Sequence, residues 1–432
     1  MVDYTRADVA HLLRRAGFSS LPAEIDARMG EASWADVVDA VLDTTANPPD
    51  VIPAVVANPE ARDIDRLVAA IVSWMGRMAT TPTPIVEKVT FFWHGILTSS
   101  APEVDTLLVF RQIQTWRRLG LGDVHALMQA MAIDPAMLDY LDNADNVKSS
   151  PNENFARELM ELFTMGNFTF TEADVVAMAR AWTGHNLKAS TGTYVFRPAQ
   201  HDTGQKTLFG ITRNWDGPEA LTEILRGSKQ PVSARYLAGR IWSAFAYPGP
   251  APALLDELTA ALIAVDLDVS AFLRVVFLRP EFRAASTRTA LVRSPVEWEI
   301  AILRATGLRV ADIADADVQQ RLGQVLLRPP NVSGWKQNRV WISSSAMWAK
   351  GILASGLQQA LAAKGTFADL AAMSTADAVA SVLARFGVDA PSAATVAHLE
   401  GYLAGERSAG RGAAAPPTLA ALVTLTPDFQ LA

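Results

Sequence analysis

The chain of 432 residues contains no cysteine. This absence excludes disulfide bonds, thiolate metal sites, iron–sulfur clusters and cysteine nucleophiles. Histidine is also scarce, at six residues, so few imidazoles are available for acid–base or metal chemistry. The usual nucleotide-binding glycine loops, the Gly-x-Ser-x-Gly elbow and the His-Glu-x-x-His motif are all missing. Composition and motifs therefore point to no standard enzyme class.

Long apolar runs are missing too. No stretch of about 18 apolar residues occurs, so we expect no membrane partner. Residues 1–20 lack the apolar segment of a signal peptide, which predicts a cytoplasmic protein. The formal net charge is −7, and the acidic excess is spread along the chain. Nucleic-acid binding needs clustered cations, so we expect no nucleic-acid partner, whereas a small anionic ligand stays open.

Helical periodicity dominates the sequence and predicts an all-α fold, in one large multi-helix domain over residues 1–432. The periodicity fails in two irregular segments, 184–215 and 328–345. Within them, Thr193–Phe196 and Arg339–Ile342 could form strands, giving one or two short β-hairpins. Residues 405–417, rich in Gly, Ala and Pro, predict a mobile loop.

One helix has clear terminal signals. Ser150 fits the N-cap, with Pro151 in the first position and Glu153 in the third, and Gly166 fits the C-terminal stop. Thr171 caps the next helix, which Gly184 can end. The first of these helices carries its polar side chains on one face and its apolar side chains on the other.

Several stretches of the sequence form recognisable motifs: Pro151–Phe163 (PNENFARELMELF), Leu12–Phe18, Phe92–Gly95, Asp134–Leu138, His201–Gly204, Pro329–Trp335 and Thr426–Gln430. These stretches resemble a large bacterial family known as domain of unknown function 1800. The resemblance covers nearly the whole chain and implies no established activity. His185 stands where the family pattern leads us to expect Trp, so this imidazole is not expected to serve any family-wide chemistry.

The candidate catalytic residues are His94, Arg157, Glu158, His201 and Asp202. His94 follows an aromatic run that predicts burial, and a buried imidazole needs hydrogen-bond partners or a metal. His201 and Asp202 lie together in the first irregular segment, where they could act as a base, as ligands or as part of a turn. Arg157 would anchor an anionic group of the substrate.

A divalent metal is the one cofactor that these residues suggest, with His94, Glu158, Glu161 and His201 as candidate ligands. Glu158 and Glu161 are one helical turn apart, so their carboxylates could bind one cation. The alternative is an ordinary solvated helix face with i,i+4 ion pairs. We expect His94 and Glu158 to lie buried in one cluster, and segment 184–215 to fold over the helix that follows Ser150.

Two functions remain open from the sequence. The first is an enzyme with a polar His/carboxylate/Arg pocket, with or without a metal, that carries out hydrolytic or redox chemistry on a small polar or anionic substrate. The second is a binding or accessory protein in which the same residues form a buried structural network. The sequence identifies no protein partner.

Overall fold

The structure, a computed structural model, describes residues 3–188, 191–313 and 316–432. The first half of the chain forms α1 (Arg6–Ala16), α2 (Pro22–Arg28), α3 (Trp34–Leu42), α4 (Ala54–Ala57), α5 (Asp63–Thr80), α6 (Pro84–His94), α7 (Thr106–Leu119), α8 (Val124–Ala132), α9 (Pro135–Tyr140), α10 (Asn154–Glu158), α11 (Glu172–Ala181) and α12 (Gly217–Leu225). The second half forms α13 (Gln230–Phe245), α14 (Pro252–Ala264), α15 (Val269–Leu278), α16 (Pro280–Arg283), α17 (Pro295–Thr306), α18 (Val310–Ile313), α19 (Ala316–Leu322), α20 (Ser344–Lys364), α21 (Thr375–Arg385), α22 (Ala393–Ser408), α23 (Pro416–Val423) and α24 (Pro427–Gln430). The predicted all-α fold is confirmed.

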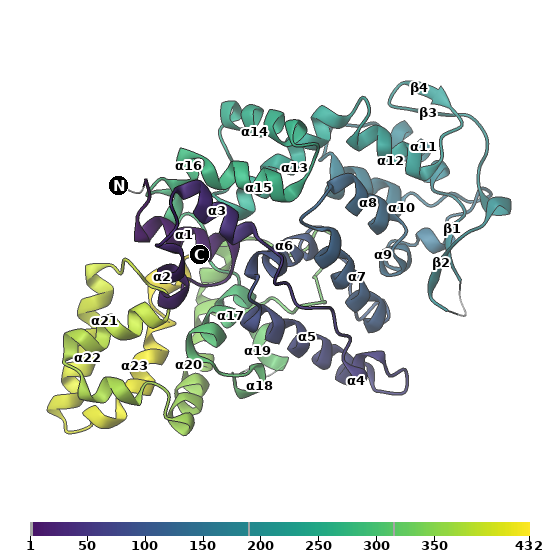
Figure 1. Ribbon diagram of the computed structural model, residues 1–432. Helices are drawn as coiled ribbons and strands as arrows, with labels where there is room; N and C mark the ends of the chain where they lie inside the picture. The colour runs from purple at the N-terminus through teal and green to yellow at the C-terminus, as the bar shows by residue number, and fades with distance from the viewer. Residues whose placement is uncertain (1–2, 189–190, 314–315) are drawn as a thin grey trace.

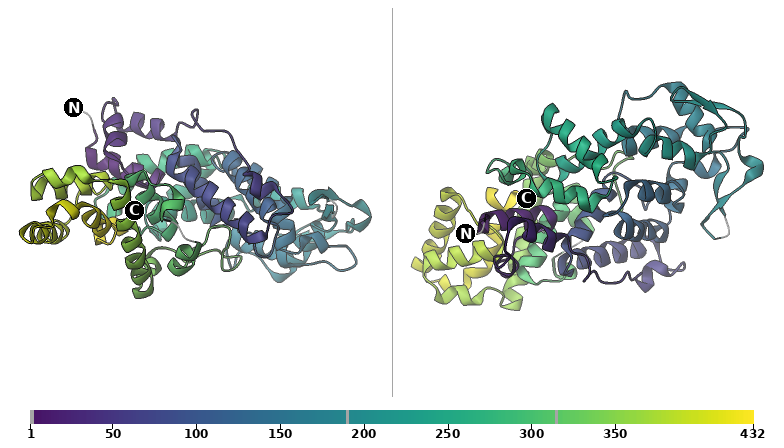
Figure 2. Two further views of the ribbon diagram at one scale, coloured as in Figure 1. Left: turned by 90° about the horizontal axis from the view of Figure 1, so that it is seen from below. Right: turned by 45° about the horizontal axis from the view of Figure 1, so that its top comes forward.

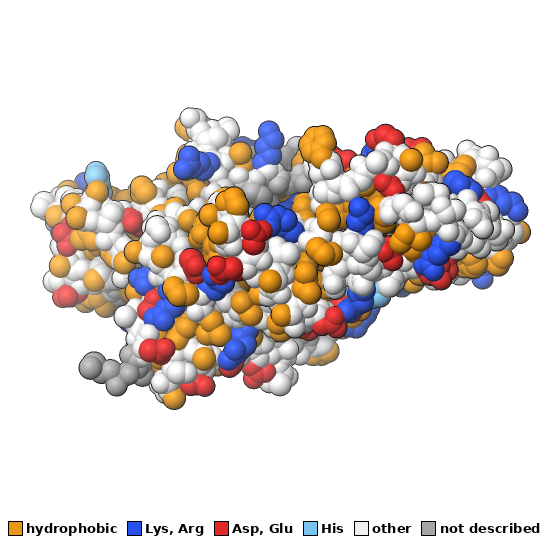
Figure 3. Space-filling view, turned by 90° about the horizontal axis from the view of Figure 1, so that it is seen from above, with side chains coloured by type: hydrophobic (Ala, Val, Ile, Leu, Met, Phe, Trp, Pro, Cys, Tyr) orange, Lys and Arg blue, Asp and Glu red, His pale blue; other side chains and the backbone are white. Residues whose placement is uncertain are grey.

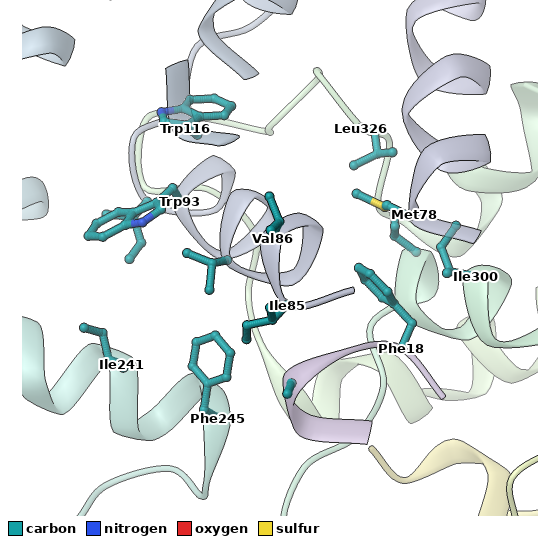
Figure 4. Close-up of a cluster of buried hydrophobic side chains, with 14 of the residues drawn as sticks. Phe18, Met78, Ile85, Val86, Trp93, Trp116, Ile241, Phe245, Ile300 and Leu326 are labelled. Carbon is teal, nitrogen blue, oxygen red and sulfur yellow. The ribbon is translucent and has the colours of Figure 1, made fainter. Parts of the chain in front are cut away.

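The helices pack into an elongated body, with α21–α23 at one end and the β-strands at the other (Figures 1 and 2). One continuous hydrophobic core runs through it, from Tyr4 to Phe429. Helix α6 lies in its middle and packs on α1, α5 and α7. Ile85 and Val86 of α6 face side chains from several other helices, including Phe245 of α13 (Figure 4). The chain therefore returns to α6 repeatedly, which brings distant segments together there.

Both strand pairs lie in the first irregular segment, as antiparallel hairpins. Strand β1 (His185–Lys188) pairs with β2 (Thr193–Phe196), and β3 (Lys206–Leu208) pairs with β4 (Ile211–Arg213). The predicted strand at Thr193–Phe196 is therefore confirmed. The predicted strand at Arg339–Ile342 is wrong, because Asn338–Ile342 forms a short 3₁₀ helix, η5, that leads into α20. Neither of the two hairpins in the described residues pairs with this segment, so it has no strand partner there.

The helix expected to start at Ser150 starts later. Glu153 is its N-cap, and its side chain makes no capping hydrogen bond. The backbone before it is held in a loop, because the Asn152 N–H donates to Asn146 Oδ1 at 2.9 Å. After Glu158 the helix widens into a π-helix, η2, over Leu159–Thr164. By contrast, Thr171 caps α11 with a complete capping box, as predicted.

The segment predicted as a mobile loop, residues 405–417, is partly helical. Helix α22 continues to Ser408, a short 3₁₀ turn covers Gly412–Ala414, and α23 begins at Pro416. Burial of Leu399 and Leu403 against the core stabilises α22 enough to keep Gly405 helical. Among the described residues, no helix has the length and apolar character needed to cross a membrane.

Candidate anion-binding pocket

His94 ends α6 and is completely buried. Its ring is surrounded by the indoles of Trp74, Trp116 and Trp335, with ring centroids 5.1–5.3 Å away. Its Nε2 accepts the Leu327 N–H at 3.1 Å, so Nδ1 carries the proton of the neutral ring. Burial lowers the pKa of His94 to about 3. His94 therefore stays neutral and ties the loop at Leu327 to the end of α6.

Arg157 and Glu158 follow one another on α10. Arg157 pairs with Glu153, and with Glu172 of α11 at 2.7 Å, rather than pointing into a cavity. Glu158 is half-buried, and its pKa is raised by burial and by the charge of Glu161. These contacts match the alternative of a partly solvated helix face.

His201 and Asp202 hold the hairpin segment onto the end of α11. His201 Nδ1 donates to the Thr183 carbonyl at 2.8 Å. Asp202 pairs with Arg180 at 2.7 Å and accepts the Gly204 N–H at 2.8 Å. Burial raises the pKa of Asp202, but Arg180 and the Gly204 N–H outweigh it, so the pKa lies below its usual value. The turn alternative accounts for these contacts.

The candidate residues lie in three separate groups. In the described ranges, no hydrogen bond or ion pair joins His94 to Glu158, His201 or Asp202. Among those residues, no three His, Asp or Glu side chains are placed to hold a metal. The proposed ligand set of His94, Glu158, Glu161 and His201 thus gains no support from this geometry. Segment 184–215 was expected to fold over the helix that follows Ser150. One contact lies close to that position, because the Lys148 N–H, just before α10, donates to the Gln200 carbonyl at 2.8 Å.

A pocket of about 450 Å³ opens beside α6, and the sequence analysis did not predict it. This volume lies in the range of small-molecule sites. Its apolar walls come from aromatic and aliphatic side chains of α6, the turn after α6, α13 and the loop before η5, namely Phe91, Phe92, Ile96, Phe245 and Trp335. Its charged side chains are four cations and one carboxylate: Arg15, Lys88, Arg240, Arg339 and Glu297. The pocket thus combines a positive charge excess with a flat apolar surface.

Arg15 of α1 is the most unusual of these side chains. It is 1% exposed, and its Nη2 donates to the Thr287 carbonyl at 2.6 Å. Its Nε and Nη1 have no hydrogen-bond partner. Burial lowers its pKa to about 9, and the charges of Arg14 and Arg293 act in the same direction. Two buried charged donors of Arg15 therefore lack an acceptor, which is costly unless a ligand supplies one.

The single carboxylate of the pocket is already paired. Glu297 of α17 forms an ion pair with Lys88 of α6 and accepts the Ser294 N–H at 2.8 Å. Burial raises the pKa of Glu297, but Lys88 and these hydrogen bonds outweigh it, so Glu297 remains charged. Behind the wall, Arg293 is 2% exposed and donates to the Phe429 carbonyl at 2.6 Å. Burial lowers the pKa of Arg293 to about 9, and the charge of Arg14 acts in the same direction, while Glu297 acts against it.

The loop that supplies Trp335 is held against the end of α6 by hydrogen bonds. The Ala101 N–H donates to the Leu327 carbonyl at 2.8 Å, and Thr98 Oγ1 donates to the Val332 carbonyl at 2.6 Å. Gly334 has φ +73°, and a Cβ there would lie 2.5 Å from the carbonyl oxygen of Gly95. Only glycine permits this close approach, which places Trp335 against the pocket.

Comparison with known protein families gives one match. The model of the family described as "Protein of unknown function (DUF1800)" matches residues 11–431. The chain belongs to the DUF1800 family. No curated protein and no solved structure shows significant similarity to it.

Three of the stretches that carry the DUF1800 resemblance meet at the pocket. Leu12–Phe18 supplies Arg15, Phe92–Gly95 supplies two lining residues, and Pro329–Trp335 supplies Trp335. The pocket is therefore lined in part by stretches that carry the resemblance. The signal that could have found Arg15 is its position on α1, one turn after the buried Leu12 on the apolar face.

Proposed function

We propose that this chain binds a small organic anion, with a carboxylate or similar group and a flat apolar body, in the pocket beside α6. The observation that carries the proposal is Arg15, whose buried guanidinium has two donors without an acceptor. A carboxylate at this point would accept from one of them, Nε or Nη1, which point to different edges of the planar guanidinium. Phe91, Phe245 and Trp335 offer the faces on which an aromatic or aliphatic body can pack.

Binding is better supported than catalysis. The one Asp or Glu side chain that lines the pocket, Glu297, is paired with Lys88, and no histidine lines the part of the pocket that the structure describes. The enzyme prediction, hydrolytic or redox chemistry at His94, Arg157, Glu158, His201 and Asp202 with or without a divalent metal, has less support because these residues do not form one site. Elemental analysis of the purified chain tests it, since a stoichiometric metal that is lost in His201→Asn would favour the enzyme.

Isothermal titration with 2-naphthoate and its neutral analogue 2-naphthamide tests the binding proposal. The two molecules share a ring system and differ in charge. We expect naphthoate to bind one site per chain, and the amide to bind at least about tenfold more weakly, because a charge-assisted hydrogen bond to Arg15 contributes about 1.5–3 kcal/mol. Equal affinity for the two would refute recognition of the anion, and absence of any naphthoate binding would refute this class of ligand.

A further inference from the structure

Four exposed apolar side chains follow the pocket-lining residue Arg339 along the chain. Exposed fractions are 74% for Trp348, 45% for Ile352, 43% for Ile342 and 39% for Val340. Val340 and Ile342 belong to η5, and Trp348 and Ile352 lie one turn apart on α20. Ser343 joins the two elements as the C-cap of η5 and the N-cap of α20. We call these four side chains the Trp348 patch.

This part of the chain carries positive side chains and no negative ones. Residues 318–368 contain no Asp or Glu, although the whole chain carries 45 of them. Lys336 and Arg339 are exposed just before the patch. Exposed apolar side chains beside cations, on a segment without carboxylates, complement an anionic surface. By contrast, positive and negative side chains are interspersed over the face of the molecule that Figure 3 shows.

The patch also adjoins the mouth of the pocket. Arg339 lines the pocket and immediately precedes Val340 of the patch. Trp335, Gln337 and Asn338 line the same side of the pocket. A molecule that leaves the pocket along this segment would therefore meet the patch. The pocket's own chemistry, cations with an aromatic wall, suits an amphiphile, and amphiphiles concentrate at lipid–water interfaces.

We propose that the Trp348 patch docks on a bilayer surface that contains anionic lipid, and so holds the pocket mouth at that surface. Trp is enriched at membrane interfaces because its indole is apolar with one polar N–H. Isoleucine and valine insert shallowly, while Lys336 and Arg339 meet anionic headgroups. The contact is peripheral and needs no spanning helix. An anionic bilayer suits the patch better than an acidic polypeptide, because the same segment lines a pocket for an amphiphile.

Co-sedimentation of the full chain with vesicles tests the proposal. The vesicles contain either phosphatidylcholine alone or phosphatidylcholine with about one third phosphatidylglycerol. We expect binding to the anionic vesicles only, weakened by added salt. Trp348→Ala should lower the partition coefficient about tenfold, since it removes the largest inserted apolar surface. Lys336→Gln should lower it about fivefold, the effect of one cation near such a surface.

Phe168→Ala is the matched control. Phe168 is fully exposed, is distant from the patch in the sequence, and has no cation next to it in the chain. It should leave vesicle binding unchanged. Naphthoate titration of Trp348→Ala shows that the variant is folded, and failure of naphthoate to bind the wild-type chain would count against the pocket proposal alone. The docking proposal is overturned if the wild-type chain ignores anionic vesicles, or if Trp348→Ala binds them normally. Binding to poly-glutamate without binding to vesicles would assign the patch to an acidic polypeptide instead.

Discussion

Replacing Arg15 by methionine separates ligand binding from folding. Methionine fills a similar volume but removes the buried charge and the two donors that lack an acceptor. Burial lowers the pKa of Arg15 from 12.5 to about 9, which corresponds to about 5 kcal/mol against the charged form in the empty pocket. The variant also loses one hydrogen bond to Thr287, worth about 1–2 kcal/mol. The empty variant should therefore unfold at the same temperature as the wild type, or higher.

The affinity of Arg15→Met for naphthoate, unlike its stability, should fall. A bound carboxylate would accept one charge-assisted hydrogen bond from Arg15, worth about 1.5–3 kcal/mol. Its loss should weaken naphthoate affinity by roughly 10- to 150-fold. Titration calorimetry measures the affinity, and a thermal melt without ligand measures folding. The affinity for 2-naphthamide should change little.

Arg14→Met is the matched control. Arg14 is the preceding residue but pairs with Asp389 at 3.3 Å and does not line the pocket. Its replacement should lower stability without a comparable loss of naphthoate affinity. The reasoning is refuted if Arg15→Met binds naphthoate as the wild type does, or if both variants lose affinity equally.

The remaining predictions concern buried charge, helix boundaries and the candidate residues of α10. Burial raises the pKa of Glu299 to about 8, so the folded chain holds a proton that the unfolded chain releases above about pH 4.5, and stability should fall as pH rises through this range. Glu299→Gln should remove that dependence and add about 3 kcal/mol to the free energy of unfolding at pH 7. Urea denaturation at several pH values measures this. The reasoning is contradicted if the stability of the variant changes with pH as that of the wild type does. Gly405→Ala should raise the free energy of unfolding by up to about 1 kcal/mol, because Gly405 is helical and its Cβ position is open; a mobile loop would show no gain in a melt. Glu158→Gln should change stability by less than about 1 kcal/mol and leave naphthoate binding intact, whereas a large loss of bound metal on elemental analysis would restore the enzyme prediction.

Local signals in the sequence predicted local structure well. Helical periodicity gave the fold class, and Thr171 with Asp174 gave the start of α11, because each depends on residues a few positions apart. Ser150 failed as an N-cap because a tertiary contact, from Asn146, holds the following backbone in a loop. Residues 405–417 failed because packing of α22 overrides the low helix propensity of glycine.

The pocket could not be predicted in the same way. Its charged lining comes from α1, α6, α13, α17 and η5, which only the folded chain brings together. Attention to His201 and Asp202 followed from their position in a long irregular segment, and that segment instead forms two hairpins pinned by those residues. The residue types were also misleading, because the scarce histidines drew attention while the decisive feature is an arginine on an apolar helix face.

A crystal structure of the chain with 2-naphthoate tests the central claim most directly. The account predicts the carboxylate within hydrogen-bond distance, about 2.7–3.0 Å, of Arg15 Nε or Nη1, and the ring system against Phe245 and Trp335. Naphthoate bound elsewhere, or bound in the pocket with its carboxylate away from Arg15, would contradict it.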